Sequence, residues 1–442
     1  MRRHVSRCIF LISSLAFAVI FFAVPCFADT PARIDTGDTS WIMISSALVF
    51  FMMPGLAFFY GGLVRKKNVL SILTQCFITI CLITLQWILF GYSLSFGPDV
   101  KGLIGNFAWA GLRGVGLDPY PAYAATVPHQ LFMIYMSMFA VITPALILGA
   151  FAERMRFSAF CVFMLLWSTF VYNPVTHWIW GLGGFLRQAG TLDFAGGIVV
   201  HVNAGVAALA TALYLGKRQG FPAQISPPHN LPLAVLGAGM LWFGWFGFNA
   251  GSALCSGALA VNAFVMTHAA GAAAGLTWAL LDWIFNERPT VLGMITGAVA
   301  GLAAVTPAAG YVNIWGALAI GVVVSFLCYW AVVFVKTKFS YDDSLDVFGV
   351  HGVGGTWGSI AVGLFATKAV NAAGADGLFF GNPAQLLIQM KAVAVTAGYS
   401  LVVTFGLLWV VDRLVGLRVS ENEERIGLDL TQHREVGYTV LD

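Results

Sequence analysis

The sequence predicts an all-α polytopic membrane protein with eleven transmembrane helices. Hydrophobic residues make up 59% of the 442 residues, charged residues only 10%, and the mean hydropathy is +0.83. A soluble domain needs roughly a quarter of charged residues to cover its surface. The composition therefore excludes soluble enzymes, disordered proteins and fibrous proteins, and a formal net charge of +3 gives no indication of nucleic-acid binding.

The first 28 residues have the layout of a secretory signal peptide. Arg2, Arg3 and Arg7 form a basic start, an apolar run covers 9–24, and Ala28 is a small residue at the expected cleavage point. The alternative is one further transmembrane helix. Cleavage after Ala28 would leave the mature N-terminus outside the cytoplasm.

Eleven apolar runs in the mature chain are long enough to cross a bilayer, whose hydrocarbon core of about 30 Å takes about 20 residues. They cover 41–63, 70–97, 130–152, 157–180, 194–216, 231–251, 256–282, 291–308, 312–335, 347–367 and 385–411.

Basic residues predict the orientation of these spans. Most of them follow odd-numbered runs, namely Arg65, Lys66, Lys67, Arg154, Arg156, Lys217, Arg218, Arg288, Lys336 and Lys338. The even-numbered connections hold fewer, which are Lys101, Arg113, Arg187 and Lys368. Because positive charge stays on the cytoplasmic side, we expect a multi-pass inner (cytoplasmic) membrane protein. Its mature N-terminus would be periplasmic and its C-terminus cytoplasmic.

A weak internal repeat suggests how the spans are organised. His201-Val-Asn-Ala-Gly205 in the fifth run and His351-Gly-Val-Gly-Gly355 in the tenth both read HxxxG. A unit of five spans is odd, so its second copy inserts upside down. The pattern predicts an inverted five-helix repeat plus a C-terminal helix, with the functional site between the halves near the bilayer midplane.

Two histidines lie deep inside apolar runs, where ionisable residues are costly and therefore functional candidates. His201 follows Asp193 by eight residues, about 12 Å along a helix, and His351 lies about five residues into a helix of opposite direction. The two imidazoles are therefore expected to meet near mid-membrane, where they can share a proton or guide a small polar molecule. The alternative is a packed, hydrogen-bonded pair without a transport role.

The remaining polar residues favour structural roles. Asp193 is expected to cap a helix N-terminus, with ligand recruitment as the alternative. His268 is interpreted as structural, and His129, His177 and His229 as interfacial. The five cysteines of the mature chain are interpreted as small buried hydrophobes, and no metal or disulfide framework is predicted; they are Cys76, Cys81, Cys161, Cys255 and Cys328.

Aromatic residues form the second candidate site. Trp180 ends the fourth run at the predicted outer surface, and Phe139, Trp245, Phe246 and Phe248 lie in neighbouring runs. Such a cluster can hold a small cation by cation–π attraction of about 0.5–2 kcal/mol, and a hydroxyl such as that of Ser252 adds a hydrogen bond. The alternative is the aromatic belt that membrane proteins carry at the interface.

Five segments together resemble the Amt ammonium transporter family and cover the mature chain in order. They are residues 59–70 (FYGGLVRKKNVL), 149–157 (GAFAERMRF), 193–205 (DFAGGIVVHVNAG), 245–252 (WFGFNAGS) and 346–352 (DVFGVHG). The resemblance implies a homotrimer of eleven-helix subunits with one pore in each, no cofactor, and a transport rather than an enzymatic activity.

The resemblance also implies roles for individual residues. Trp180, Phe139, Ser252 and Tyr135 would bind the substrate at an outer ammonium site, and Phe139 and Phe248 would form the gate. His201 and His351 would line the pore and relay the proton, and Asp193 would support the site structurally. Tyr135 differs from the family pattern, because bacterial relatives commonly carry phenylalanine at this position. We expect its hydroxyl to shift affinity and leave the mechanism intact.

Residues 29–415 are thus predicted to form the transporter domain, and 416–442 a cytosolic C-terminal regulatory tail. In the family the tail crosses to a neighbouring subunit and takes part in control by PII-type signal proteins; read alone, it is a charged, solvated tail. The predicted function is recruitment of ammonium at the aromatic site, deprotonation, and conduction of ammonia into the cytoplasm, with or without a separately relayed proton.

Three alternatives remain open. An ammonium sensor would use the same scaffold and signal through the tail, a membrane redox enzyme would use His201 and His351 as axial haem ligands, and a Rhesus-type gas channel is a nearer relative.

Overall fold

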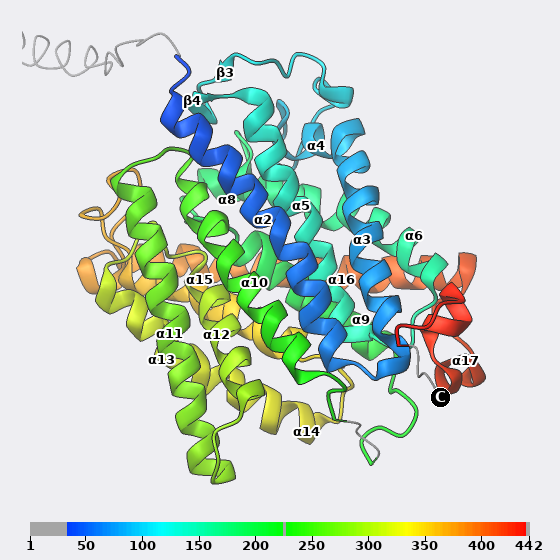
Figure 1. Cartoon of the computed structure of the whole chain (residues 1–442). Coiled ribbons are helices and arrows are strands. Elements are labelled where there is room, and N and C mark those ends of the chain that lie inside the picture. The colour runs from blue at the N-terminus through cyan, green and yellow to red at the C-terminus, as the bar shows by residue number, and fades with distance from the viewer. Residues whose placement is uncertain (1–32, 224–226, 439–442) are drawn as a thin grey trace, which may run out of the picture.

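The computed structural model describes residues 33–223 and 227–438, which are largely helical (Figure 1). The predicted signal peptide, residues 1–28, lies outside the described residues. The earlier helices are α2 (Thr36–Leu63), α3 (Val69–Gln86), α4 (Tyr92–Phe96), α5 (His129–Phe151), α6 (Phe157–Trp167), α7 (Asn173–Trp180), α8 (Phe185–Gln188) and α9 (Asn203–Leu215). The later helices are α10 (Leu231–Ala250), α11 (Ala258–Asn286), α12 (Val291–Val305), α13 (Ile314–Trp330), α14 (Lys336–Phe339), α15 (Val353–Phe365), α16 (Pro383–Val415) and α17 (Glu421–Ile426).

Four short strands lie in the connection between α4 and α5. β1 (Asp99–Val100) pairs antiparallel with β2 (Ile104–Gly105), and β3 (Pro119–Tyr120) pairs antiparallel with β4 (Ala124–Pro128). β3 and β4 lie beside the start of α2 at one end of the molecule, which we call the strand end (Figure 1). α14 and α17 lie at the opposite end, which we call the tail end.

Within the described residues, nine helices are long and apolar enough to cross a membrane. α12 is a shorter apolar helix, and the run predicted at 347–367 is occupied by α15 and the π-helical turn before it. Such π-helical turns interrupt several helices and are frequent at functional sites. They are η2 (Trp87–Gly91), η4 (Ser168–Tyr172), η5 (Gly197–Val202), η7 (Ala331–Val335), η8 (Phe348–Gly352) and η10 (Asp429–His433).

Polar residues mark where several helices begin. The side chains of Asn230, Thr290 and Asn313 accept hydrogen bonds from the backbone N–H groups of the first turns of α10, α12 and α13. These caps satisfy donors that have no partner inside the helix. The apolar runs therefore become helices whose ends are fixed by the sequence.

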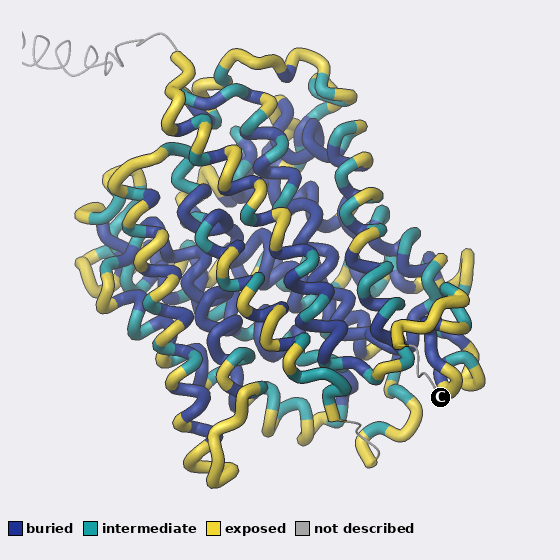
Figure 2. The backbone as a smooth tube through the Cα atoms, in the orientation of Figure 1, coloured by how far each residue is buried: buried dark blue, intermediate teal, exposed yellow. Residues whose placement is uncertain are grey.

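The buried residues form a continuous interior (Figure 2). Large apolar side chains are also exposed on the outer faces. At the tail end of α11, Trp283, Ile284 and Phe285 are 62%, 71% and 59% exposed. Lipid rather than water suits such a surface. The prediction that the cysteines are buried holds for Cys76 but is wrong for Cys81, which lies on the outward face of α3.

Glycine residues, which have no side chain, allow the helices to pack closely. A Cβ at Gly237 on α10 would lie 2.2 Å from the backbone nitrogen of Phe59 on α2. Only glycine therefore permits the two helices to touch along this line, which is how small residues bring helices together in membranes. The close contact also fixes α10, which carries Phe248, against α2.

Candidate functional site

The two HxxxG motifs cross each other in the interior. A Cβ at Gly205 on α9 would lie 2.2 Å from the backbone nitrogen of Gly352 in η8, and a Cβ at Gly355 on α15 would lie 2.7 Å from the Cβ of His201. The glycine of each motif thus packs against the histidine-bearing turn of the other. This reciprocal contact brings His201 and His351 together from segments 150 residues apart (351 − 201).

The two imidazole rings are stacked. Their centroids lie 5.2 Å apart with 13° between the ring planes, and the residues are 2% and 5% exposed. Among residues 33–223 and 227–438, none forms a hydrogen bond with either ring nitrogen of His201 or with Nδ1 of His351. Because nearly all buried polar groups are hydrogen-bonded, these nitrogens are free to bind a small polar molecule.

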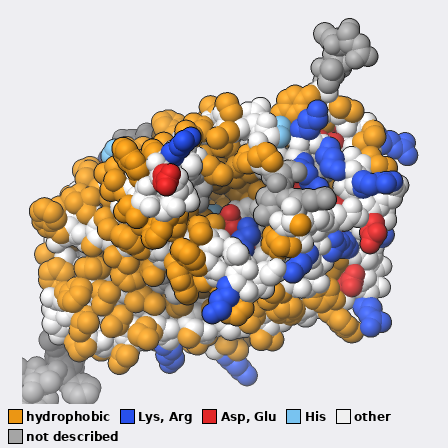
Figure 3. All heavy atoms as spheres, turned by 90° about the horizontal axis from the view of Figure 1, so that it is seen from below, with side chains coloured by type: hydrophobic (Ala, Val, Ile, Leu, Met, Phe, Trp, Pro, Cys, Tyr) orange, Lys and Arg blue, Asp and Glu red, His pale blue; other side chains and the backbone are white. Residues whose placement is uncertain are grey.

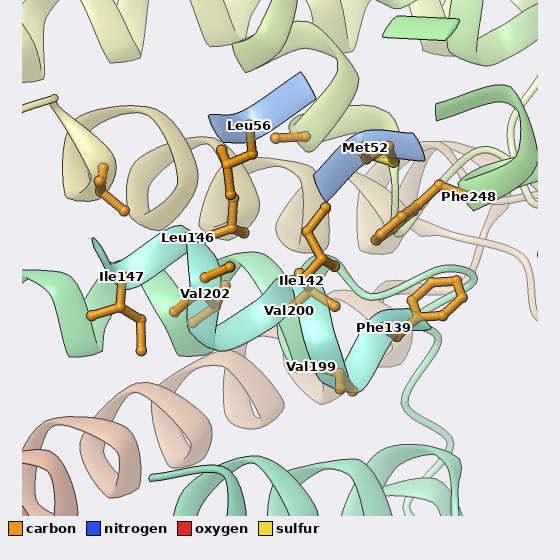
Figure 4. Packing of buried hydrophobic residues seen from close by; sticks show 14 of the residues in the cluster. Met52, Leu56, Phe139, Ile142, Leu146, Ile147, Val199, Val200, Val202 and Phe248 are labelled. Atoms are coloured by element: carbon orange, nitrogen blue, oxygen red, sulfur yellow. The ribbon is translucent and has the colours of Figure 1, made fainter. Parts of the chain in front are cut away.

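A narrow apolar cavity of about 10 Å³ contains both histidines, which is room for about one water-sized molecule. Figure 4 shows Met52 and Leu56 of α2 facing Ile142 and Leu146 of α5 across this region. The complete lining is Met52, Leu56, Phe59, Ile142, Leu146, Val200, His201, Leu241, Trp245, Phe248 and His351.

This geometry argues against the haem alternative. Axial ligation requires each histidine to point a ring nitrogen at the iron from opposite sides of the macrocycle. His201 and His351 present their ring faces to each other, and the cavity between the apolar side chains is far smaller than a porphyrin.

Two phenylalanines close the cavity toward the strand end. The rings of Phe139 on α5 and Phe248 on α10 lie 4.4 Å apart between centroids at 43°, and the residues are 0% and 1% exposed. Figure 4 shows them approaching from opposite sides. Since the ring of His201 lies 6.1 Å from that of Phe248, these phenylalanines stand between the histidines and the strand end.

Beyond the phenylalanines lies an open cavity of about 480 Å³, which we call the outer vestibule. Trp180 and Ser252 line it, together with Asp193 and Arg187. The Trp180 ring stands perpendicular to that of Phe139 at 5.7 Å. The Ser252 hydroxyl donates to the carbonyl of Phe248 over 2.9 Å, which leaves its oxygen lone pairs available to a donor in the vestibule.

Tyr135 lies behind this surface. It is fully buried, its ring lies 5.1 Å from that of Phe139, and its hydroxyl lies 3.2 Å from the Ser252 hydroxyl. The same hydroxyl is 3.0 Å from the carbonyl oxygens of Gly247 and Phe248. Tyr135 therefore touches the residues of the outer vestibule without lining the vestibule itself.

Asp193 is a helix cap. Its carboxylate accepts four backbone N–H groups, those of Gly196, Gly197, Ile198 and Val199, over 2.6–3.1 Å. Its own carbonyl accepts the indole N–H of Trp180 over 2.9 Å. One residue thus holds both the start of the turn that carries His201 and the tryptophan of the outer vestibule.

Asp343 is a residue that the sequence analysis missed. Its carboxylate is buried and accepts the backbone N–H of Phe348 over 2.8 Å, at the start of the turn that carries His351. The signal was present, because Asp343 precedes His351 by eight residues, as Asp193 precedes His201. Trp245 has a clearer role than expected, since its ring stacks on His201 at 5.6 Å.

A second large cavity of about 340 Å³ opens from His351 toward the tail end and is lined also by Phe59, Arg218 and Asp346. Arg218 forms ion pairs with Asp342 at 2.8 Å and with Glu153 at 3.3 Å. Burial alone would raise the pKa of the Glu153 carboxyl, but the hydrogen bond and charge of Arg65 and the charge of Arg218 hold it below its ordinary value.

The other histidines lie away from this path. Interfacial roles stay a prediction for His129 and His177, which lie near the ends of α5 and α7 and are buried with an internal partner each. His129 bonds the Tyr92 hydroxyl at 2.6 Å, and His177 pairs with Asp99 at 2.9 Å. Both partners come from distant segments, so the sequence offered no sign of them.

The tail is docked rather than simply solvated. Glu424 accepts from the backbone N–H of Gln219 over 2.6 Å and pairs with Arg418 at 2.9 Å. The carboxylate of Asp429 accepts the backbone N–H groups of Leu70 and Ser71 over 3.0 and 2.8 Å, at the start of α3. The reading of a purely solvated tail is therefore wrong.

Residues 40–438 match the model described as the Ammonium Transporter Family. The chain is 51% identical over 402 residues to an ammonium transporter of Bacillus subtilis (strain 168), which covers 91% of this chain and 98% of that relative. It is similar to the crystal structure of Saccharomyces cerevisiae Mep2 with a TM-score of 0.83 and 36% identity, covering 89% of each chain. A structure titled Sensor Amt Protein matches with a TM-score of 0.83 and 28% identity, covering 90% of this chain and 98% of that one.

Proposed function

The chain belongs to the ammonium transporter family, and from that premise we propose that it binds ammonium in the outer vestibule and passes ammonia through the histidine-lined cavity into the cytoplasm. The observation that carries the proposal is the pair of buried, stacked imidazoles whose nitrogens lack partners in an otherwise apolar cavity. Ionisable side chains at the centre of an apolar channel are costly, which makes them candidates for a functional role.

The substrate site combines two attractions. Trp180, which lines the vestibule and packs against the buried Phe139, favours a small cation. Ser252 offers an oxygen that accepts a hydrogen bond from ammonium. Tyr135 shapes the site through its contact with Ser252. Potassium has a similar size but donates no hydrogen bond, so the Ser252 oxygen attracts it only as an ion–dipole contact.

Deprotonation explains how the substrate passes the gate. A cation that enters an apolar cavity without compensation pays a large desolvation cost. Ammonium avoids most of this cost because it can lose a proton at Phe139 and Phe248 and continue as ammonia. His201 and His351 then offer hydrogen bonds to the neutral molecule, and they are also placed to relay the proton.

The wider assembly follows the same proposal. Eleven spans in an inverted five-helix repeat put the strand end outside and the tail end in the cytoplasm of an inner-membrane protein, and three subunits form a homotrimer. Figure 3 views the tail end and shows more Lys and Arg side chains than Asp and Glu side chains, which supports this orientation. We further propose that the docked tail is the surface at which a PII-type protein exerts control.

The decisive experiment is uptake of labelled methylammonium by vesicles that contain the purified protein. The wild type is expected to take up the label with excess potassium outside. Replacing both histidines, His201→Ala with His351→Ala, is expected to abolish uptake or its discrimination against potassium. His268→Ala is the matched control, because His268 is exposed on α11 and outside the three cavities. Selective uptake that is unchanged in the double variant would refute the proposal.

The sensor is the second candidate, because one similar structure is titled as a sensor. Growth of a transport-deficient cell on limiting ammonium separates the two functions. A transporter restores growth, whereas a sensor binds ammonium without restoring it.

A further inference from the structure

The outer vestibule carries an arginine that the proposed mechanism does not use. Of its lining residues, only Arg187 and Asp193 are charged. The carboxylate of Asp193 is committed to four backbone N–H groups. Arg187 instead lies exposed on α8, and its guanidinium donates to the backbone carbonyl of Trp180. A positive charge therefore stands at the rim of a site that binds a positive ion.

The charge of Arg187 acts on two separate segments of the vestibule wall. Burial raises the pKa of Tyr311 to about 12 and Asp193 adds to the rise, while Arg187 opposes it. Burial likewise raises the pKa of Tyr123, and the backbone N–H of Leu182 and the charge of Arg187 lower it. Tyr311 lies between α12 and α13 and Tyr123 lies before β4, so the field of the arginine spans the mouth of the vestibule.

We propose that Arg187 is an affinity-determining residue, whose charge repels cations from the outer vestibule and weakens the apparent affinity for ammonium. This inference rests on the proposed function, since it concerns the same substrate site. Two unit charges about 4 Å apart in water repel by about 1 kcal/mol, and the repulsion decreases with distance. Because the arginine is exposed, salt screens the effect over about 10 Å at 0.1 M.

A purely structural role for Arg187 makes a different prediction. Its hydrogen bond to the Trp180 carbonyl helps to hold the tryptophan, although the indole N–H is already fixed by Asp193 at 2.9 Å. If holding Trp180 were the only role, loss of the guanidinium would weaken binding, and the weakening would depend neither on the sign of the new charge nor on salt.

A charge series separates the two accounts. Arg187→Lys keeps the charge, Arg187→Gln removes it and Arg187→Glu reverses it. The KM for methylammonium uptake into vesicles is measured at about 10 mM and about 500 mM ionic strength. At low salt we expect the lysine variant to resemble the wild type, and KM to fall about two- to fivefold for each unit of charge removed. At high salt the four proteins are expected to converge.

Arg113→Gln is the matched control, because Arg113 is an exposed arginine in the connection between α4 and α5 that does not line the vestibule. It is expected to leave KM unchanged at both salt concentrations. A KM that rises equally in the glutamine and glutamate variants, or that shows the same change at both salt concentrations, overturns the inference.

Calorimetric measurement of the Kd of methylammonium on the same purified variants keeps this test independent of transport. A wild type that binds without uptake would refute the proposed transport, yet the order of the four Kd values would still decide the role of Arg187.

Discussion

Gly205 and Gly352 approach so closely that a Cβ on Gly205 would lie 2.2 Å from the backbone nitrogen of Gly352. The contact joins α9 to the turn that carries His351, so the distance between the two imidazoles depends on it. The HxxxG motif is therefore a packing device as well as a carrier of histidine.

Gly205→Ala is expected to separate these segments and to abolish methylammonium uptake, because a Cβ so close to backbone atoms forces the helix to move. Uptake and thermal unfolding in detergent measure the result. Gly398→Ala on α16 is the control, since its Cβ would meet nothing within 4 Å. Normal uptake and stability in Gly205→Ala would contradict the packing argument.

Tyr135→Phe is expected to tighten substrate binding. The single proton of the Tyr135 hydroxyl can be donated to the carbonyl oxygens of Gly247 and Phe248 or to the Ser252 hydroxyl 3.2 Å away. In the second arrangement it competes for the oxygen that would accept a hydrogen bond from ammonium. One such bond contributes about 1 kcal/mol, which corresponds to a fall in KM of about fivefold. Tyr172 is also buried but does not line the outer vestibule, and Tyr172→Phe should leave KM unchanged. A higher KM in Tyr135→Phe would show that the hydroxyl assists binding.

Asp193→Asn is expected to destabilise the protein and to reduce uptake. An amide has one acceptor oxygen, so two of the four N–H groups that Asp193 now satisfies would face an NH₂ group. Hydrogen bonds to a charged group contribute about 1.5–3 kcal/mol each, so the loss should be at least about 3 kcal/mol. Thermal unfolding measures it.

Asp343→Asn is the matched control for the stability loss expected in Asp193→Asn. Oδ2 of Asp343 accepts the backbone N–H of Phe348 over 2.8 Å, fewer close bonds than the four that Asp193 accepts. The expected loss is therefore smaller, about that of one bond at most. Equal losses in the two variants would mean that the number of capped N–H groups does not determine the stability of these turns.

Glu153 predicts a pH dependence of stability. The hydrogen bond and charge of Arg65 and the charge of Arg218 outweigh burial and hold the pKa of Glu153 below its ordinary value of 4.5. A carboxyl with a lowered folded-state pKa stabilises the protein above its unfolded-state pKa, and this contribution is lost as the pH falls through the folded-state value. Glu153→Gln should therefore lower the unfolding temperature above about pH 5.5, with a difference that shrinks in acid.

Unfolding temperatures between pH 3 and pH 8 test this expectation. Glu421→Gln is the control, because Glu421 is exposed and its carboxylate forms no ion pair in the described part of the chain. A deficit of Glu153→Gln that stays constant down to pH 3 would show that its charge does not contribute.

The apolar runs alone determined the membrane class and the approximate position of most helices, because the length and composition of each run are local properties. The sequence also identified His201 and His351 as candidate functional residues inside apolar runs, and the HxxxG spacing that both share indicated their common context. Asp343 precedes His351 by as many residues as Asp193 precedes His201, so the sequence also contained the signal for Asp343, which was missed.

Only the tertiary structure decided which side chains meet. It stacks the imidazoles and leaves three of their nitrogens without partners, places Tyr135 behind Ser252, buries His177 against Asp99 and sets Arg187 at the rim of the outer vestibule. The physical reason is that hydropathy specifies that a residue is buried in a helix but not which neighbour it contacts. That choice depends on the helix crossings, which are fixed by contacts such as those of Gly205 between segments far apart in the chain.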